Sequence, residues 1–240
     1  MRKTQPSTRE RSLVGALSLG GSLFVLAPQA MASGGHWMVD DAAVFPKGTP
    51  AIEGWHEDFG DSASATTLQP AYTFRNGVEI TGVIESFSPN GSSEEVFGLE
   101  AKGLWYDFEG GDDFGLGWVV GTAFDDDADL EEIFVYVPYS QPIGDAGMLF
   151  HANVGWEQDR TGPDNEDNFF FGAGSEIPVG GPASAIVEVL GNSDDDTFAQ
   201  AGARFELGAS PGLLDLSYGQ NLDESDDDWI TIGFAWEFGG

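Results

Sequence analysis

Three histidines, His36, His56 and His151, are the residues of this sequence best suited to general acid–base chemistry near neutral pH. Hydrolysis by a Ser–His pair needs an imidazole within hydrogen-bond reach of a hydroxyl and a third group that orients the ring. His151 and Asn153 are two residues apart, which places both on one face of an extended strand. A histidine hydrogen-bonded to its neighbours is the simpler interpretation, and no G-x-S-x-G motif occurs. The sequence therefore predicts a protein that is not an enzyme.

Two runs of acidic residues offer the carboxylate oxygens that Ca²⁺ and Mg²⁺ prefer. The candidate ligands are Asp125, Asp126, Asp127, Asp129, Asp226, Asp227 and Asp228. Neither run has the residue order of an EF-hand loop, and most charge runs are solvated loops. We therefore expect no cofactor beyond loosely bound Ca²⁺ or Mg²⁺.

The composition excludes several other classes of function. Nine Lys and Arg residues stand against 41 Asp and Glu residues, which gives a formal net charge of −32. Nucleic acid is not an expected partner, because phosphate binding depends on clustered cations. Disulfides, thiolate catalysis and cysteine-ligated metals are ruled out, since the sequence has no cysteine. An acidic excess of this size repels itself unless salt screens it, so we expect a saline or halophilic source.

The first 32 residues have the pattern of a secretory signal peptide. Four basic residues precede an apolar run over residues 12–27, and Ala30-Met31-Ala32 matches a cleavage site. The run is shorter than the roughly 20 residues of a membrane-spanning helix. We expect residues 1–32 to be removed from the mature chain.

Beyond residue 32, large apolar residues alternate with small or polar ones, as in 114–124 and 229–238. Alternation with period two is typical of strands, and about 9–11 residues suffice for a tilted strand to cross a bilayer. Twelve segments have this pattern: 50–59, 65–75, 78–87, 96–108, 114–124, 132–140, 147–157, 168–177, 183–190, 197–207, 213–220 and 229–238. The sequence predicts an all-β fold, a single antiparallel up-and-down transmembrane β-barrel of about 12 strands over residues 49–240. Aromatic residues near strand ends, Trp229 among them, are expected to face lipid headgroups.

The connections support a barrel because short turns and longer acidic loops alternate. Asn76-Gly77 and Gly180-Gly181 are typical of tight hairpins, whereas residues 125–132 and 223–228 are long and acidic. Periplasmic turns and extracellular loops differ in this way, and an even strand count places both chain ends on the periplasmic side. Residues 33–48 would then be a periplasmic N-terminal segment, either a tail or a small insert in the lumen.

Alternation also assigns residues to the lumen of the barrel. The expected lumen-lining residues are Glu79, Glu85, Glu100, Lys102, His151, Asn153, Glu157, Glu176, Arg204, Glu206, Asp215 and Glu237. Lys102 and Arg204 are expected to pair with Glu100 or Glu206. Glycines on the inward face, such as Gly115, Gly121 and Gly172, indicate either open space or tight curvature of the wall.

The final segment, Trp229 to Phe238, resembles the closing strand of Gram-negative outer-membrane β-barrel proteins, which ends in an aromatic residue. That resemblance implies recognition of Phe238 by the barrel assembly machinery, although Gly239 and Gly240 follow it here. The run from Gly35 to Ala42 is similar to the mature start of small uncharacterised porin-like proteins of about 12 strands. The resemblance implies a cell outer membrane location, with membrane lipid and lipopolysaccharide as surroundings.

Two functions remain open for such a barrel. The first is a narrow porin-like channel for small solutes or cations, because rings of acidic side chains favour cations. The second is a non-conducting barrel whose acidic loops bind divalent cations or external partners. A soluble acidic β-sandwich or β-helix is a further alternative, in which the bulky apolar residues would form a dry core.

Overall fold

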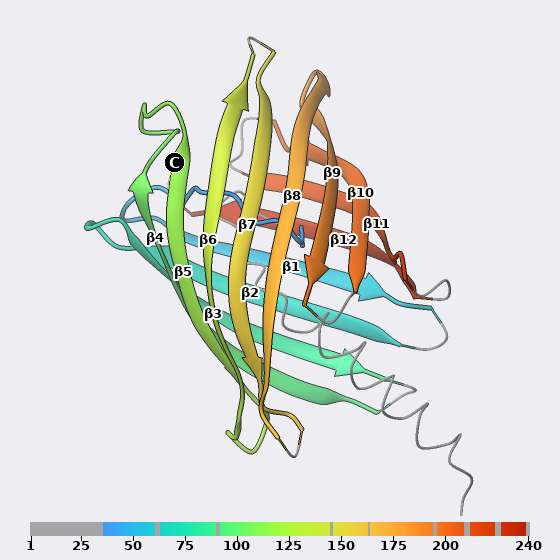
Figure 1. Ribbon diagram of the computed structural model, residues 1–240. Helices are drawn as coiled ribbons and strands as arrows, with labels where there is room; N and C mark the ends of the chain where they lie inside the picture. Colours follow the sequence, from blue (N-terminus) through green and yellow to red (C-terminus); the bar gives the residue numbers. More distant parts are fainter. Residues whose placement is uncertain are drawn as a thin grey trace, which may run out of the picture.

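The computed structural model describes residues 36–60, 63–89, 92–144, 146–162, 164–193, 196–208, 212–223 and 227–238. These ranges contain twelve β-strands and no helix (Figure 1). The first six strands are β1 (Pro50–Asp58), β2 (Ser64–Thr73), β3 (Val78–Ser88), β4 (Glu94–Tyr106), β5 (Gly115–Phe124) and β6 (Leu130–Ile143). The other six are β7 (Met148–Asp159), β8 (Glu166–Gly180), β9 (Ala183–Asn192), β10 (Thr197–Glu206), β11 (Gly212–Asn221) and β12 (Asp228–Glu237). Each strand overlaps one segment expected from alternation, whereas the predicted signal peptide lies outside the described residues.

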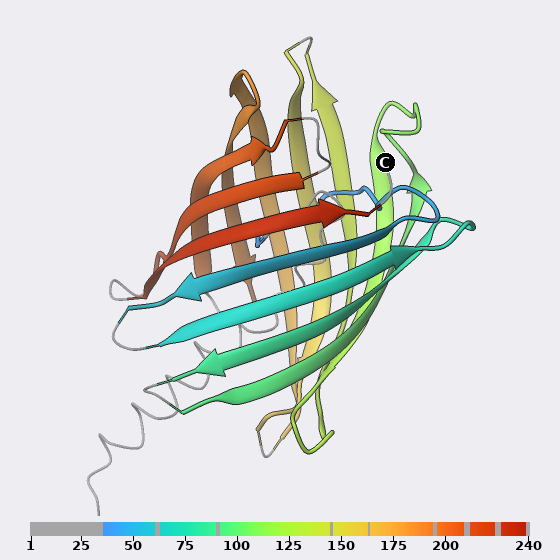
Figure 2. The same cartoon turned by 180° about the vertical axis from the view of Figure 1, so that it is seen from behind.

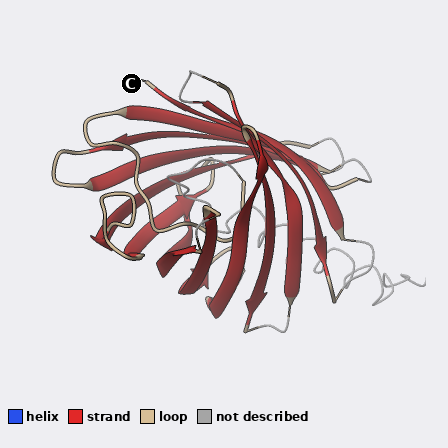
Figure 3. Cartoon of the chain, turned by 90° about the horizontal axis from the view of Figure 1, so that it is seen from above, coloured by secondary structure: helices blue, strands red, loops and turns tan. Residues whose placement is uncertain are grey.

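The twelve strands close into a single barrel. Every strand pairs antiparallel with the next one along the chain, and β1 pairs with β12 to complete the ring (Figures 2 and 3). Closure leaves no unpaired sheet edge, which a strand in hydrocarbon requires because no water is present to satisfy its backbone groups. The predicted antiparallel up-and-down barrel is therefore confirmed. Within the described ranges there is also no helix long and apolar enough to cross a membrane.

The outer face of the barrel is apolar. Four bulky apolar side chains on this face are 53–63% exposed: Val154, Phe171, Leu216 and Ile232. In each case a residue next to it in the same strand is buried in the interior. The arrangement is the reverse of a soluble fold, in which bulky apolar side chains gather in a shared dry core. An apolar exterior of this kind is stable only against lipid, so the barrel spans a membrane.

Trp229 corrects one expectation from the sequence. Instead of facing lipid headgroups, its side chain is only 2% exposed and packs inside the barrel against Met38 and Phe198. Position 229 has the same parity as Thr231 and Gly233, which are also buried. The indole covers Gly219 of β11, where a Cβ atom would collide with the ring. Register therefore outweighs the preference of tryptophan for the membrane interface.

The two ends of the barrel differ, and we call them the turn end and the loop end. Asn76-Gly77 and Gly180-Gly181 make connections at the turn end, with Gly77 at φ +84° and Gly180 at φ +116°. Acidic residues 125–129 lie at the loop end. The connection from β4 to β5 at the turn end is longer than expected, because β4 stops at Tyr106 and β5 begins at Gly115. β1 begins and β12 ends at the turn end, as an even strand number requires.

Replacing an apolar residue in the middle of the outer face should destabilise the barrel in lipid. Leu216→Arg is expected to lower the free energy of unfolding by about 2–4 kcal/mol, because an arginine near the bilayer midplane loses its hydration. Leu222→Arg is the matched control, since Leu222 is similarly exposed (55% against 53%) but follows the end of β11. Its cost should be about 0–1 kcal/mol. Denaturant unfolding in lipid vesicles measures both values, and equal costs would contradict a membrane-spanning outer face.

Candidate functional site in the barrel interior

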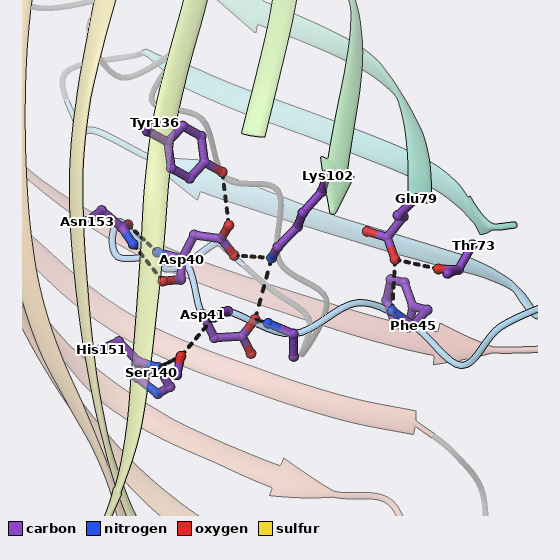
Figure 4. A network of polar contacts seen from close by, with 12 residues as sticks. Asp40, Asp41, Phe45, Thr73, Glu79, Lys102, Tyr136, Ser140, His151 and Asn153 are labelled. Carbon is purple, nitrogen blue, oxygen red and sulfur yellow. Dashed lines mark hydrogen bonds and ion pairs between the residues drawn. The ribbon is translucent and has the colours of Figure 1, made fainter. Parts of the chain in front are cut away.

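Residues 36–45, which we call the lumen segment, run through the inside of the barrel. His36, Asp40 and Ala42 are fully buried, and Trp37 and Phe45 are 1% and 3% exposed. The sequence left two placements open for residues 33–48, a periplasmic tail or an insert in the lumen. In the structure, residues 36–45 are an insert in the lumen (Figure 4).

Side chains of the wall bind the backbone of the lumen segment. Four backbone N–H groups donate to wall side chains: Met38 to Glu188 Oε2 (2.8 Å), Asp40 to Asn153 Oδ1 (2.7 Å), Ala42 to Ser140 Oγ (2.7 Å) and Phe45 to Glu79 Oε2 (2.8 Å). Asn153 also donates its Nδ2 to the carbonyl oxygen of Asp40 at 2.8 Å. The donors at 38, 40 and 42 alternate along the segment, so one side of an extended chain faces these acceptors. The wall thus binds the segment much as a receptor binds an extended peptide.

A buried ion pair fastens the middle of the segment. Lys102 Nζ lies 2.8 Å from Asp40 Oδ1 and 3.5 Å from Asp41 Oδ1, and Tyr136 donates its hydroxyl to Asp40 Oδ2 at 3.0 Å (Figure 4). Burial raises the pKa of the Asp40 carboxyl, and the ammonium of Lys102 opposes that rise by favouring the carboxylate. The charge on Asp40 therefore depends on Lys102, which comes from β4 and is itself 1% exposed.

The cation partners expected from the sequence were wrong. Lys102 pairs with the lumen segment, and Arg204 pairs with Asp215 (Nε to Oδ1, 3.0 Å) and with Glu176 (Nη1 to Oε2, 3.4 Å). Arg204 and Asp215 are direct cross-strand neighbours of β10 and β11, and such pairs lie closer than residues two apart on one strand. Trp37 Nε1 also donates to Asp215 at 3.2 Å, so this pair contacts the segment as well.

Glycines in the wall make room for the lumen segment. A Cβ atom at Gly115 would lie 2.9 Å from Ala42 Cβ, one at Gly172 would lie 2.9 Å from Val39 Cγ2, and one at Gly233 would lie 2.8 Å from His36 Nδ1. At Gly121, the ring of Phe134 takes the corresponding space. At these four glycines the space is filled by other side chains, so the interpretation that they mark open space was wrong there.

Apolar contacts complete the fit at both ends of the segment. Trp37 packs with Ile186, Met38 with Phe198 and Trp229, and Phe45 with Ala51 and Ala71. The ring of His36 stacks on Trp37 with centroids 4.8 Å apart, and His36 Nε2 shares a hydrogen bond with Ser217 Oγ. Burial, with a smaller effect from Arg204, lowers the pKa of His36 to about 3, so its ring is neutral at physiological pH.

Ser140 and His151 form a pair with the spacing of a nucleophile and a base, yet the pair is already occupied. Ser140 Oγ lies 2.8 Å from His151 Nδ1 and accepts the N–H of Ala42. The serine is fully buried beneath the segment. A substrate carbonyl has no approach to Oγ, so the two residues act as an anchor for the lumen segment.

Most of the residues assigned to the lumen are buried in it. The buried ones are Glu79, Glu85, Glu100, Lys102, His151, Asn153, Glu157, Arg204 and Asp215. Glu176 and Glu237 are partly buried. Glu206, the last residue of β10, is exposed at the turn-end rim.

Sequence reasoning missed other interior carboxylates and the acids of the lumen segment. Glu53, Glu57, Glu132 and Glu188 are all buried in the wall. Their alternation with exposed neighbours was a usable signal, since Glu53 and Glu57 share the inward face of β1 with Trp55. Among the described residues, eleven buried carboxylates stand against two buried cations, Lys102 and Arg204. The interior is therefore strongly acidic.

The acidic loops show a different use of their carboxylates. Asp125 Oδ1 accepts the backbone N–H groups of Asp127 (3.0 Å) and Asp129 (2.8 Å), which shapes the turn between β5 and β6. Asp226 lies outside the described residues. In the part of the chain that the structure describes, no three His, Asp or Glu side chains converge as metal ligands. Cation binding by these loops stays a prediction.

Three solved structures with a similar barrel are described as porins or an outer membrane channel. The "KdgM porin in complex with disordered oligogalacturonate" is 11% identical, with a TM-score of 0.63 over 79% of this chain and 99% of that one. The NanC porin is 10% identical, with a TM-score of 0.60 over 79% of this chain and 100% of that one. The COG4313 outer membrane channel from Pseudomonas putida F1 is 10% identical, with a TM-score of 0.60 over 82% of this chain and 98% of that one. At these identities the likeness establishes the fold.

Sequence comparison gives the family. Among curated proteins, no sequence matches this chain. The model of a protein family described as "Uncharacterised conserved protein UCP029691" matches residues 22–238, which cover all twelve strands and the lumen segment. The chain belongs to this family of uncharacterised conserved proteins.

Proposed function

We propose that the protein is an outer-membrane channel of Gram-negative bacteria that passes small solutes and prefers cations. The observation that carries the proposal is the acidic wall of the interior, where nine buried carboxylates face two buried cations among the described residues, not counting Asp40 and Asp41 of the lumen segment. Rings of acidic side chains in a pore attract cations and repel anions. The apolar outer face fixes the barrel in the membrane, so the lumen is the path that remains for a polar solute.

The charges are arranged unevenly along the barrel. Glu57, Glu132 and Glu157 lie within three residues of strand ends at the loop end. Lys102 pairs in register with the second residue of β3, and Arg204 with the second residue of β9, both next to the turns of the other end. A solute that enters from the loop end therefore meets carboxylates before it meets a cation. Such an entrance concentrates cations by electrostatic attraction.

The shared fold with KdgM, NanC and the COG4313 channel supports a channel function, and the solute is expected to differ from that of KdgM. The KdgM structure is described as holding oligogalacturonate, a chain of acidic sugars. An interior dominated by carboxylates repels such an anion. Neutral or positively charged small solutes fit this lumen better.

A non-conducting barrel is the second candidate, favoured by the lumen segment that occupies the interior. In that case the acidic loops would be the functional surface, with divalent cations or external partners as ligands and lipopolysaccharide around them. Assembly would be the same in both cases. Phe238, 52% exposed beyond β12 and with its N–H donated to Pro50 O at 2.8 Å, offers an aromatic end to the barrel assembly machinery.

Neutralising interior carboxylates should weaken the preference for cations. Glu85 and Glu132 are suitable because each is buried and has one carboxylate oxygen without a hydrogen-bond partner, so a glutamine fits without breaking a contact. The Glu85→Gln/Glu132→Gln variant is expected to lower the cation-to-anion permeability ratio by about two- to tenfold, the effect of removing nearby unit charges in a medium of intermediate dielectric. Reversal potentials across planar bilayers with a salt gradient measure this ratio.

Glu206→Gln is the matched control, because Glu206 is exposed at the rim. It should leave the permeability ratio almost unchanged. Anion selectivity of the unmodified protein would contradict a selective acidic lumen. An equal change of the permeability ratio in the double variant and in the Glu206→Gln control would also contradict it.

We also propose that the protein is adapted to saline surroundings. The net charge of −32 includes exposed acids at the loop end, and at about 1 M salt the Debye length falls to roughly 3 Å, so that neighbouring loops no longer repel each other. The melting temperature in detergent is expected to rise between about 0.05 M and 1 M NaCl through this screening. Circular dichroism during heating measures the shift, and a melting temperature independent of NaCl would contradict the adaptation.

A further inference from the structure

We propose that the interior of the barrel is a binding site for the chain's own residues 36–45, that Lys102 latches them there, and that the barrel conducts only when they are released. This inference rests on the proposed channel function and adds its regulation. The lumen segment is then a resident plug: the barrel is closed while the segment is in place and conducts during the intervals in which the segment is released.

The barrel closes without the lumen segment, which makes release compatible with the fold. Pairing between β1 and β12 begins at Ala51 and Glu237, after the segment has ended. Backbone pairing of the chain with the wall is already present at Gly48, whose N–H donates to Thr73 O at 2.7 Å. Residues 36–45, in contrast, are held by side chains of β3, β4, β6, β7 and β9. Removing them breaks no strand pairing of the barrel.

The middle of the segment is held by polar contacts that water can replace, whereas release also exposes the apolar contacts of Trp37, Met38 and Phe45 at its ends. The backbone N–H groups that donate to Glu188, Asn153, Ser140 and Glu79 can exchange these acceptors for solvent once the lumen is hydrated. The net contribution of a hydrogen bond to stability is small when water can replace the partner, whereas a buried group left without any partner costs much more free energy. Entry of water or of a solute with its own donors therefore lowers the cost of release.

Lys102 is the latch because it holds two carboxylates of the segment at once. Its ammonium contacts Asp40 and Asp41, and all three side chains are 0–7% exposed. Breaking a buried pair by removing one partner leaves an uncompensated charge, which costs far more than the loss of an exposed pair. Arg204, the other buried cation among the described residues, is engaged by Asp215 and Glu176 of the wall. We therefore expect a single substitution of Lys102 to favour release of residues 36–45 from the lumen.

The chain also provides a hinge between the plug and the first strand. Pro46, Lys47 and Gly48 are exposed, whereas Phe45 is buried. Gly48 has φ +86°, a conformation that other residues rarely adopt, and Thr49 N–H donates to Pro46 O at 3.0 Å to form a tight turn. Residues 36–45 can swing about this turn while β1 stays in the wall.

Thiol labelling tests the latch independently of conductance. The chain has no cysteine, so Ala42→Cys places a single thiol in the buried plug. In the full-length protein in lipid vesicles, adding Lys102→Met should raise the rate of modification by a water-soluble maleimide at least tenfold. Arg75→Met, at an exposed cation in the turn after β2, is the matched control and should not change the rate. Equal rates in the two variants would overturn Lys102 as the latch.

A reversible cross-link tests the plug without altering a charge. A Cβ at Gly115 would lie 2.9 Å from Ala42 Cβ, 2.8 Å from Ala42 O and 2.7 Å from Phe108 Cδ1. The segment and the Phe108 ring must therefore shift by roughly 1 Å for Ala42→Cys and Gly115→Cys to reach the roughly 3.8 Å typical of a disulfide. The oxidised double variant should show no conductance in planar bilayers, and reduction should restore it. The two single variants serve as controls and should be insensitive to oxidant. Heat-modifiable migration in gels verifies that each variant forms the barrel.

The outcomes separate the plug from the channel function. Conductance that is equal in the oxidised and reduced states overturns the plug and leaves the channel standing. If Lys102→Met accelerates labelling but neither it nor the reduced double variant conducts, the channel function fails while the latch on the segment holds. Conductance that disappears on oxidation and returns on reduction supports both.

Discussion

The requirement that every backbone N–H and C=O group in hydrocarbon be paired determines the rest of this structure. Twelve strands satisfy it by closing, with β1 against β12. Once the ring is closed, each strand has one face toward lipid and one toward the interior, so bulky apolar residues such as Leu216 must lie outside. The polar residues of the chain are thereby enclosed together. The acidic interior is a direct consequence of closure and composition.

An enclosed acidic interior is rich in hydrogen-bond acceptors and poor in donors. The wall contributes carboxylates, amide oxygens and hydroxyls, and only Lys102 and Arg204 as buried cations among the described residues. The lumen segment supplies what is lacking, because the backbone of an extended chain carries a donor at every non-proline residue. Met38, Asp40 and Ala42 donate to Glu188, Asn153 and Ser140, and the carboxylates of Asp40 and Asp41 meet Lys102. The segment and the wall are thus complementary in donors as well as in shape.

The sequence predicted the fold closely and the site only in part, and the difference follows from the range of the interactions. Alternation is local, so it located all twelve strands and most interior residues, including Lys102 and Asn153. The partners of those residues are not local. Lys102 meets Asp40 from 62 positions away, and the Asn153 side chain meets the Asp40 backbone from 113 away. Trp229 was misplaced because its residue type favours the membrane interface, whereas its register points inward onto Gly219. Register and non-local pairing required the structure.

The inward glycines of the wall differ in which side chains occupy the space next to them. At Gly121 the wall fills the missing side chain with its own Phe134, but at Gly172 and Gly233 the nearest occupants are Val39 and His36 of the lumen segment, and at Gly115 Ala42 of the segment shares the space with Phe108. If curvature of the wall were the only requirement, any small residue could stand at these positions. If dense packing were the only requirement, side chains of neighbouring strands could fill the space. Glycine at the three contacts instead leaves room for a segment that no strand pairing retains. The lumen segment is therefore a part of the described interior whose removal would unpair no strand of the barrel.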